Sequence, residues 1–174
     1  MTGRDDLAPE AIDALRRDLE EQLDGDVHFE RFFRGMHSTD ASVYQIVPLG
    51  VVAPRSRDDV VNTVALCRQH GVSITARGAG TSQAGQAIGS GVQVDFSKYM
   101  NRILELDPQN RLAIVEPGLI NLDLQDACAK YGLRYAPDPS SQRICTLGGN
   151  VGTNAGGPHT LAHGSTVNHV LGIE

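Results

Sequence analysis

Glycines crowd into two windows of this chain. Residues 77–85 read RGAGTSQAG, and residues 145–157 read CTLGGNVGTNAGG. Ten of the 19 glycines lie within 78–91 and 148–157. Glycine lets a backbone approach a ligand closely because no Cβ blocks the way, and successive N–H groups in such turns form a concave anion site. The two windows therefore predict a ligand with more than one phosphate, held in a cleft between them.

Two common nucleotide motifs fit these windows poorly. A Walker A loop requires a Lys after its last glycine, and neither window contains one, which disfavours a nucleoside triphosphatase. A Rossmann fingerprint requires G-x-G-x-x-G at the start of a helix. Gly78 and Gly80 match its beginning, but Gln83 stands where the third glycine belongs and no helical periodicity follows.

Polar side chains within the windows favour a ligand site over plain turns. Arg77 stands where it could meet a phosphate, and Thr81 and Ser82 add hydroxyl donors beside the N–H groups. In the second window Asn150 and Asn154 offer amides that could bind the polar edges of a ring. The alternatives are a glycine-rich hairpin for the first window and a flexible loop for the second.

Regular elements precede the first window. The apolar spacing predicts a helix over 8–23, and an irregular connector follows over 24–48. Residues 50–53 form a short apolar strand, and Ser56 with Asp59 begins a helix by a capping box. We expect Gly71 to end that helix, whose apolar face comprises Val60, Val61, Val64, Ala65 and Cys67.

The next segments complete a mixed sheet arrangement. Residues 72–76 form a strand that leads into the first window, so the strand–helix–strand unit is expected to be parallel and right-handed. Another strand is predicted over 91–96, and a hairpin turns at 107–110. A helix over 122–131, capped by Asn121 and ended by Gly132, precedes the second window. This order indicates an α+β fold.

Bulk composition excludes several classes of protein. The net charge of −6 and the aromatic content of 5% argue against a nucleic-acid binder, which needs a basic face or stacking platform. No apolar run is long enough to span a membrane, and we expect a cytoplasmic protein without a signal peptide. Three scattered cysteines without a C-x-x-C motif are expected to be buried thiols.

Histidines gather near the end of the chain. His159 and His163 have the spacing of a metal pair on a helix, but the glycines around them disfavour a helix, and no metal is predicted. A loop histidine near a ligand, or a plain surface or core residue, are the other interpretations, and His169 shares them. Residues 167–174 resemble a buried strand, so we expect the chain to be part of a longer protein.

Several motifs together resemble one family. They are the first window, the run DFSKYMNRI at 95–103, VEPG at 115–118, PDP at 137–139, and the second window followed by His163-Gly164. The chain is similar over about residues 45–174 to the FAD-binding domain of FAD-linked oxidases, the fold shared with vanillyl-alcohol oxidase and p-cresol methylhydroxylase. Within that family it most resembles glycolate-oxidase-subunit, D-lactate and D-2-hydroxyglutarate dehydrogenases.

The resemblance implies an α+β fold of the p-cresol methylhydroxylase type, with two small α+β subdomains and the cofactor cleft between them. The expected organisation is an N-terminal helix and connector at 1–48, a first FAD-binding subdomain at 49–110, and the start of a second at 111–174. The first loop is implied to hold the FAD pyrophosphate and the second segment to run beside the flavin. The implied cofactor contacts are Arg77, Gly78, Ala79, Gly80, Thr81, Ser82, Pro137, Asp138, Thr146, Gly148, Gly149, Asn150, Thr153, Asn154, Ala155, Gly157, Gly164 and Ile173.

The implied function is hydride transfer from a 2-hydroxy acid to FAD, with an electron acceptor as a second partner. Some relatives attach the flavin to a histidine at the end of the first loop, where this chain has Thr81 and Ser82, so noncovalent binding is expected. The general base and the substrate cation come from a later cap in relatives, so we assign no catalytic residue and expect this chain alone to be inactive. Some relatives also carry a C-terminal iron–sulfur region, and peripheral membrane association is an option for the whole protein. An enolpyruvyl sugar-nucleotide reductase of the same fold and a non-catalytic flavin-binding module stay as alternatives.

Overall fold

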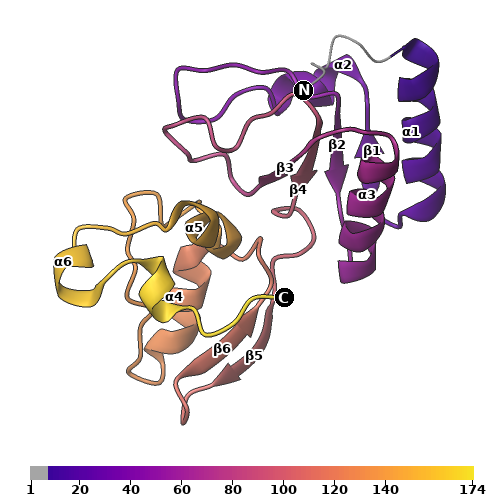
Figure 1. Cartoon of the computed structure of the whole chain (residues 1–174). Coiled ribbons are helices and arrows are strands. Elements are labelled where there is room, and N and C mark those ends of the chain that lie inside the picture. The colour runs from indigo at the N-terminus through magenta and orange to yellow at the C-terminus, as the bar shows by residue number, and fades with distance from the viewer. Residues whose placement is uncertain (1–7) are drawn as a thin grey trace. The chain divides into compact units, whose positions relative to one another are not determined.

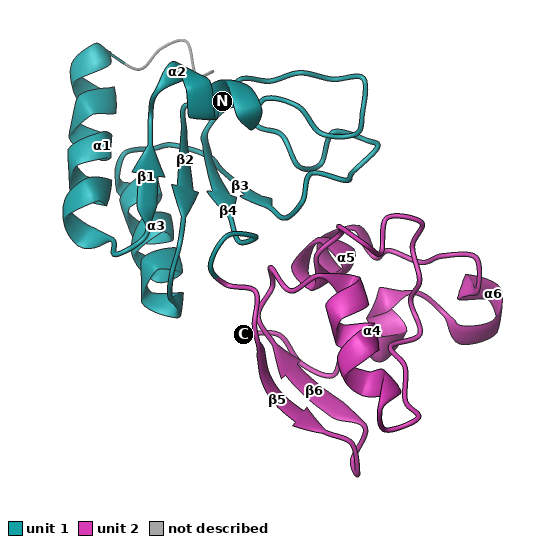
Figure 2. Cartoon of the chain, turned by 180° about the vertical axis from the view of Figure 1, so that it is seen from behind, with its two compact units in different colours: residues 1–99 teal, residues 100–174 magenta. Residues whose placement is uncertain are grey.

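The computed structural model describes residues 8–174, which form two compact units (Figure 1, Figure 2). The first unit ends at Tyr99 and the second begins at Met100. The expected boundary at 110 would have split a hairpin, whereas the structure keeps both strands of that hairpin in the second unit. Residues 1–7 of the expected N-terminal segment lie outside the described residues.

The first unit is a four-stranded sheet with the order β1-β2-β4-β3. Strands β2 and β3 both pair in parallel with β4, so the predicted parallel strand–helix–strand unit is confirmed with β4 inserted between its strands. Strand β1 pairs antiparallel with β2. The elements of this unit are α1 (Pro9–Gln22), β1 (Asp26–His28), α2 (Arg31–Met36), β2 (Gly50–Ala53), α3 (Arg57–Gln69), β3 (Ile74–Arg77) and β4 (Val92–Asp95).

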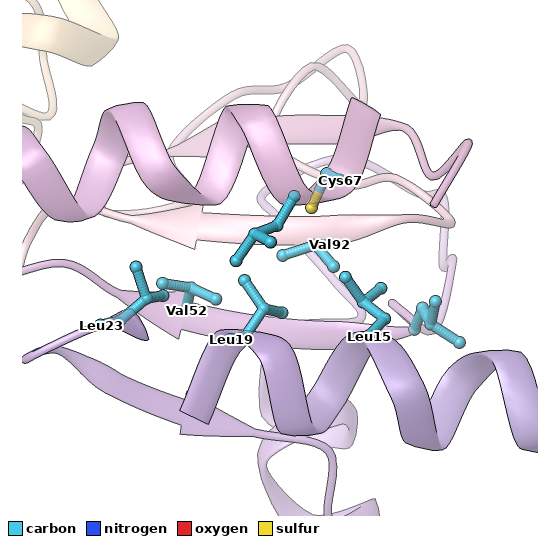
Figure 3. Close-up of a cluster of buried hydrophobic side chains, with 8 residues drawn as sticks. Leu15, Leu19, Leu23, Val52, Cys67 and Val92 are labelled. Carbon is cyan, nitrogen blue, oxygen red and sulfur yellow. The ribbon is translucent and has the colours of Figure 1, made fainter. Parts of the chain in front are cut away.

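Helices α1 and α3 supply the apolar core of this unit. Leu15 and Leu19 of α1 are fully buried and pack with Val52 and Val92 of the sheet (Figure 3). The predicted cap of α3 is confirmed, because the Ser56 side chain accepts a hydrogen bond from the Asp59 backbone N–H. Burying the α1 and α3 side chains removes apolar surface from water, which is the main favourable contribution to folding.

The face that α3 buries differs from the predicted one. Val61 and Val64 are about half exposed, whereas Thr63, Leu66 and Cys67 face the interior. The sequence predicts that Val61 and Val64 are buried because both are apolar and have helical spacing. Thr63 is accepted in the core because its hydroxyl donates to the Asp59 carbonyl within the same helix.

The predicted connector over 24–48 is wrong in part, because it contains β1 and α2. Their lengths of three and six residues are too short to produce a periodic pattern. Pairing with β2 decides the existence of β1. Asp26, the first residue of β1, accepts hydrogen bonds from Lys98 and Tyr99.

The second unit contains one hairpin and short helices. Strands β5 and β6 form the predicted antiparallel pair, and Leu119, Leu124, Cys128 and Leu147 form the buried core. Asn121 is the first residue of α4 and not its cap; its buried side chain donates to the Pro137 carbonyl. The elements are β5 (Ile103–Asp107), β6 (Leu112–Val115), α4 (Asn121–Ala129), α5 (Leu147–Thr153), α6 (Thr160–His163) and the 3-10 helix η2 (Thr166–His169).

The second glycine window contains the helix α5, although glycine has a low helix propensity. The expectation of a buried strand over residues 167–174 is wrong. The C-terminal residues form no buried strand: Leu171 and Ile173 are 86% and 77% exposed.

All three cysteines are confirmed as buried free thiols. Between residues 8 and 174 no helix combines the length and the apolar character needed to cross a bilayer.

Candidate functional site: two glycine windows

The first glycine loop carries a run of backbone N–H groups without partners. It leaves β3 at Arg77 and reaches β4 through residues 78–91. Within the described part of the chain, none of the N–H groups from Ala79 to Gln83 donates a hydrogen bond. Gly80 has φ +67°, a conformation that L side chains rarely adopt. The loop therefore has several backbone N–H donors that the rest of the described chain leaves unused.

Arg77 holds this loop in place. Its Nη1 donates to the Ala87 carbonyl at 3.0 Å and its Nη2 to the Thr39 carbonyl at 2.9 Å. Burial lowers the pKa of Arg77, while the charges of Asp95 and Asp40 act in the opposite direction. The guanidinium is thus bound to loop carbonyls, and this structure assigns it a positioning task that the sequence pattern did not reveal.

Residues near Arg77 form further hydrogen bonds that support the first glycine loop. The Asp95 carboxylate lies 3.1 Å from His37 Nε2 and accepts hydrogen bonds from the Ser97 N–H and hydroxyl. The Asp40 carboxylate accepts the Ala87 N–H at 3.4 Å. His37, Asp40 and Asp95 were missed as site residues because they come from separate elements, and only the fold brings them to Arg77.

The second window forms a helix start that needs glycine for close approach. The Thr146 hydroxyl accepts the Gly149 N–H and caps α5. The Gly148 N–H donates to the Pro117 carbonyl at 2.8 Å. A Cβ added at Gly148 would lie 2.7 Å from the Pro117 Cβ and 2.9 Å from its carbonyl oxygen. The glycine therefore lets α5 pack directly on the segment that follows β6.

Downstream of α5 a second close approach joins the loop to the PDP segment. A Cβ added at Gly157 would lie 2.3–2.5 Å from three atoms of Asp138. The Asp138 carboxylate pairs with His159 Nδ1, and this hydrogen bond is the main cause that lowers the pKa of Asp138. Pro137 beside it is fully buried. These contacts fix the loop that follows the second window.

The amides of the second window have structural partners or are buried. Asn154 adopts a left-handed conformation, with φ 49° and ψ 50°, and its side-chain oxygen accepts the Val167 N–H at 2.9 Å. Asn150 is 2% exposed, and its Nδ2 has no hydrogen-bond partner among residues 8–174. Asn150 could therefore bind the polar edge of a ligand ring, as the sequence predicts, only if its amide reached the surface.

A groove of about 540 Å³ lies on the surface of the second unit. The predicted residues Asn154 and Ile173 line it, together with Val151, Thr166, Val167, Val170, Leu171 and Gly172. Thr153 and Gly164 are near it in the chain, where the Thr153 hydroxyl donates to the Gly149 carbonyl and Gly164 has φ +80°. The Ala155 carbonyl accepts from both the N–H and hydroxyl of Thr166.

The histidines do not form a metal centre within the described residues. The ring centroids of His159 and His163 are 6.4 Å apart, and His169 Nε2 contacts the His163 carbonyl at 2.9 Å. Over residues 8–174 no three His, Cys, Asp or Glu side chains gather as ligands.

The structure collects the predicted residues into two sets, one in each unit. Gly78–Ser82 follow Arg77 on the first loop, and the other set surrounds α5 and the loop after it. The free N–H run of the first loop is chemically suited to a pyrophosphate, since charge-assisted bonds from several amides can share one anion. The residues present therefore fit a dinucleotide such as FAD at the first loop.

Solved structures define the fold class. The chain matches alkyldihydroxyacetonephosphate synthase with a TM-score of 0.77 and 23% identity, covering 95% of this chain and 32% of that one. It matches p-cresol methylhydroxylase with bound substrate at a TM-score of 0.76 and 20% identity, covering 87% of this chain and 31% of that one. The predicted p-cresol methylhydroxylase-type fold is confirmed.

The family follows from the sequence comparison. A model of the FAD binding domain matches residues 48–174, and the chain belongs to this family. It is 40% identical over 167 residues to the glycolate oxidase subunit GlcD of Bacillus subtilis (strain 168), covering 92% of this chain and 36% of that protein. It is 40% identical over 161 residues to the D-2-hydroxyglutarate dehydrogenase of Escherichia coli (strain K12), covering 90% of this chain and 16% of that protein. The chain thus spans about a third or less of these relatives.

A matched pair of glycines tests the packing of α5. Gly148→Ala should lower the free energy of unfolding by about 1–3 kcal/mol because its Cβ meets Pro117. Gly152→Ala lies in the same helix with open space around it and should raise stability by about 0.5–1 kcal/mol. Urea unfolding followed by circular dichroism measures both. Equal effects of the two substitutions would contradict the close-approach interpretation.

Acid titration tests the support beneath the first loop. Burial raises the pKa of Asp95, but hydrogen bonds from His37 and Ser97 outweigh it, so the pKa lies below its ordinary value of 3.8. The resulting stability is present above about pH 4 and is lost as the pH falls through the lowered pKa. Asp95→Asn should cost about 1–3 kcal/mol at pH 7 and progressively less below pH 4.

Urea unfolding from pH 7 to pH 2 gives this comparison, with the exposed Asp13→Asn as control. The control should stay close to the unsubstituted chain throughout. If the difference in free energy of unfolding between Asp95→Asn and the unsubstituted chain stays the same down to pH 2, the ionised Asp95 carboxylate is not the stabilising group.

Proposed function

We propose that this chain binds FAD noncovalently and is the cofactor-binding part of an oxidoreductase that oxidises a 2-hydroxy acid. The observation that carries the proposal is the unpartnered N–H run of the first loop in a member of the FAD binding domain family. The two relatives named above are a glycolate oxidase subunit and a D-2-hydroxyglutarate dehydrogenase. Both names specify 2-hydroxy acids, which supports this substrate class.

In the proposal the first loop binds the pyrophosphate. The N–H groups of residues 79–83 donate to it, with the Thr81 hydroxyl beside them, while the Ser82 hydroxyl donates to the Gln86 side chain within the loop. Arg77 keeps the loop in the binding shape through the carbonyls of Thr39 and Ala87. Residues 78–86 include no His or Cys that could attach a flavin, which supports noncovalent binding.

The second set is proposed to bind the rest of FAD. Its exposed or half-exposed members are Asp138, Gly148, Gly149, Thr153, Asn154, Ala155, Gly157, Gly164 and Ile173. The buried Pro137, Thr146 and Asn150 support that surface from within the unit. Bound FAD would supply a hydride acceptor. The chain's own residues bind and orient it, while we propose that substrate binding and proton removal use residues outside 1–174.

We also propose a cytoplasmic location. Three buried thiols without a disulfide suit a reducing compartment. The electron acceptor is expected to be a separate partner.

Two glycines with the same backbone conformation test the pyrophosphate site. Gly80 and Gly71 both have φ +67°, so the backbone conformation alone should make an alanine at either cost at least about 1–2 kcal/mol of stability. Only Gly80→Ala should weaken FAD binding, by at least about ten-fold, because its Cβ lies 2.5 Å from Arg77 Nη2 and displaces the loop. Flavin fluorescence titration measures the affinity, and acid precipitation should release all flavin. Equal FAD affinity in the two variants would contradict the assignment.

The substrate class is tested in the whole protein. Without an electron acceptor, glycolate, D-lactate or D-2-hydroxyglutarate should reduce the flavin and bleach its absorbance. An added redox dye should then be reduced as it re-oxidises the flavin, with the 2-deoxy analogues of these acids as controls. The 174-residue chain alone should bind FAD without turnover, because a base and a carboxylate-binding cation are needed for the reaction. Robust turnover by the chain alone would show that it holds the substrate groups. If NADPH bleaches the flavin and an enolpyruvyl sugar nucleotide restores its absorbance, that nucleotide is the substrate in place of a 2-hydroxy acid.

A further inference from the structure

Residues 38–46 form a closed loop beside the first glycine loop. Thr39 and Gln45 form an antiparallel bridge, and the Ile46 N–H donates to the Ser38 carbonyl at 2.9 Å. Gln45 Nε2 also donates to the Ser38 hydroxyl at 3.0 Å. These bonds order a segment that the sequence analysis leaves as an irregular connector.

The closed loop is fastened to the glycine loop at three points. The Ala41 N–H donates to the Gly80 carbonyl at 3.0 Å. Arg77 Nη2 donates to the Thr39 carbonyl at 2.9 Å, and the Asp40 carboxylate accepts the Ala87 N–H at 3.4 Å. The two loops therefore form one surface of the first unit.

Tyr44 places an aromatic ring on that surface. A Cβ added at Gly85 would lie 3.1 Å from Tyr44 Cδ2, so the ring packs against the glycine. The Tyr44 N–H donates to the Ser42 hydroxyl at 3.1 Å, which helps fix the backbone. The residue is nevertheless 59% exposed, and among the described residues its phenol makes no hydrogen bond.

An exposed aromatic ring held by an ordered backbone beside unpartnered N–H groups has a specific chemical use. A dinucleotide joins two planar ring systems through a pyrophosphate, so a ligand bound to the loop amides carries a planar ring nearby. Stacking on an aromatic side chain is tolerant of the ring's identity, because every base or flavin ring has a π-face. Glycine at position 85 leaves room for the Tyr44 ring to approach the backbone closely.

We propose that Tyr44 is a further binding residue of the dinucleotide site, stacking on a planar ring of the ligand whose pyrophosphate occupies residues 79–83. This inference rests on the proposed function and adds a residue outside the glycine windows. It assigns a binding task to the loop of residues 38–46, which is held on the glycine loop through Thr39, Asp40 and Ala41.

The test compares three variants of the 174-residue chain. Tyr44→Leu removes the ring, Tyr44→Phe keeps it, and Val43→Ala changes the neighbouring residue, which is 94% exposed. Tyr44→Leu should weaken FAD binding roughly ten-fold or more, whereas the other two should stay within about two-fold. Flavin fluorescence titration gives the dissociation constants, and thermal unfolding followed by circular dichroism verifies that each variant folds.

Titrations with AMP and with FMN distinguish the two ends of the dinucleotide. A loss of AMP affinity in Tyr44→Leu would assign the adenine ring to Tyr44, and a loss of FMN affinity would assign the flavin ring. Unchanged FAD affinity in a folded Tyr44→Leu chain would overturn the inference and leave the proposed function intact. A failure of the unsubstituted chain to bind FAD would remove the proposed function and this inference together.

Discussion

The guanidinium of Arg77 holds together the segments on which the first glycine loop depends. Its hydrogen bonds reach Ala87 at the far end of the loop and Thr39 in the connector. A half-buried cation is costly unless compensated, and the charges of Asp95 and Asp40 act on Arg77 to offset that cost. Since Asp95 also pairs with His37, the loop, β4 and the end of α2 are coupled.

This coupling matters because an anion site made of backbone N–H groups must keep its shape before the anion arrives. A loop that had to be ordered by the ligand would lose binding free energy to conformational entropy. In the proposed site, Arg77 would contribute to binding by holding carbonyl oxygens of the loop and the connector, while the N–H groups of residues 79–83 donate no hydrogen bond within residues 8–174. The positive φ of Gly80 allows the turn that this arrangement requires.

The second unit meets the same requirement by steric fit. Gly148 packs on Pro117 and Gly157 packs on Asp138 at distances that leave no room for a Cβ. Gly148 and Gly157 therefore serve close backbone packing, although the glycine density of this window resembles that of a phosphate loop. Glycine composition alone predicts an anion site at both windows, because it does not distinguish an amide that is free from one that is bonded, as the Gly148 N–H is to the Pro117 carbonyl.

Local signals in the sequence determined the elements and motifs that depend on neighbouring residues. Strand β2, the cap of α3 at Ser56, the hairpin of β5 and β6, and the position of both glycine windows follow from spacing, capping and turn chemistry. The resemblance to FAD-linked oxidases rests on the same short motifs, and the fold type was predicted from that resemblance.

Only the tertiary structure decided the features that depend on distant contacts. Strand β1 exists because β2 pairs with it. Helix α5 forms despite its glycines because Leu147 and Asn150 are buried within the second unit. The direction of Arg77 and the approach of Tyr44 to Gly85 arise from segments about 40 residues apart in the chain. Hydrogen bonding and burial between such segments outweigh local propensity, and a single sequence carries no local trace of them.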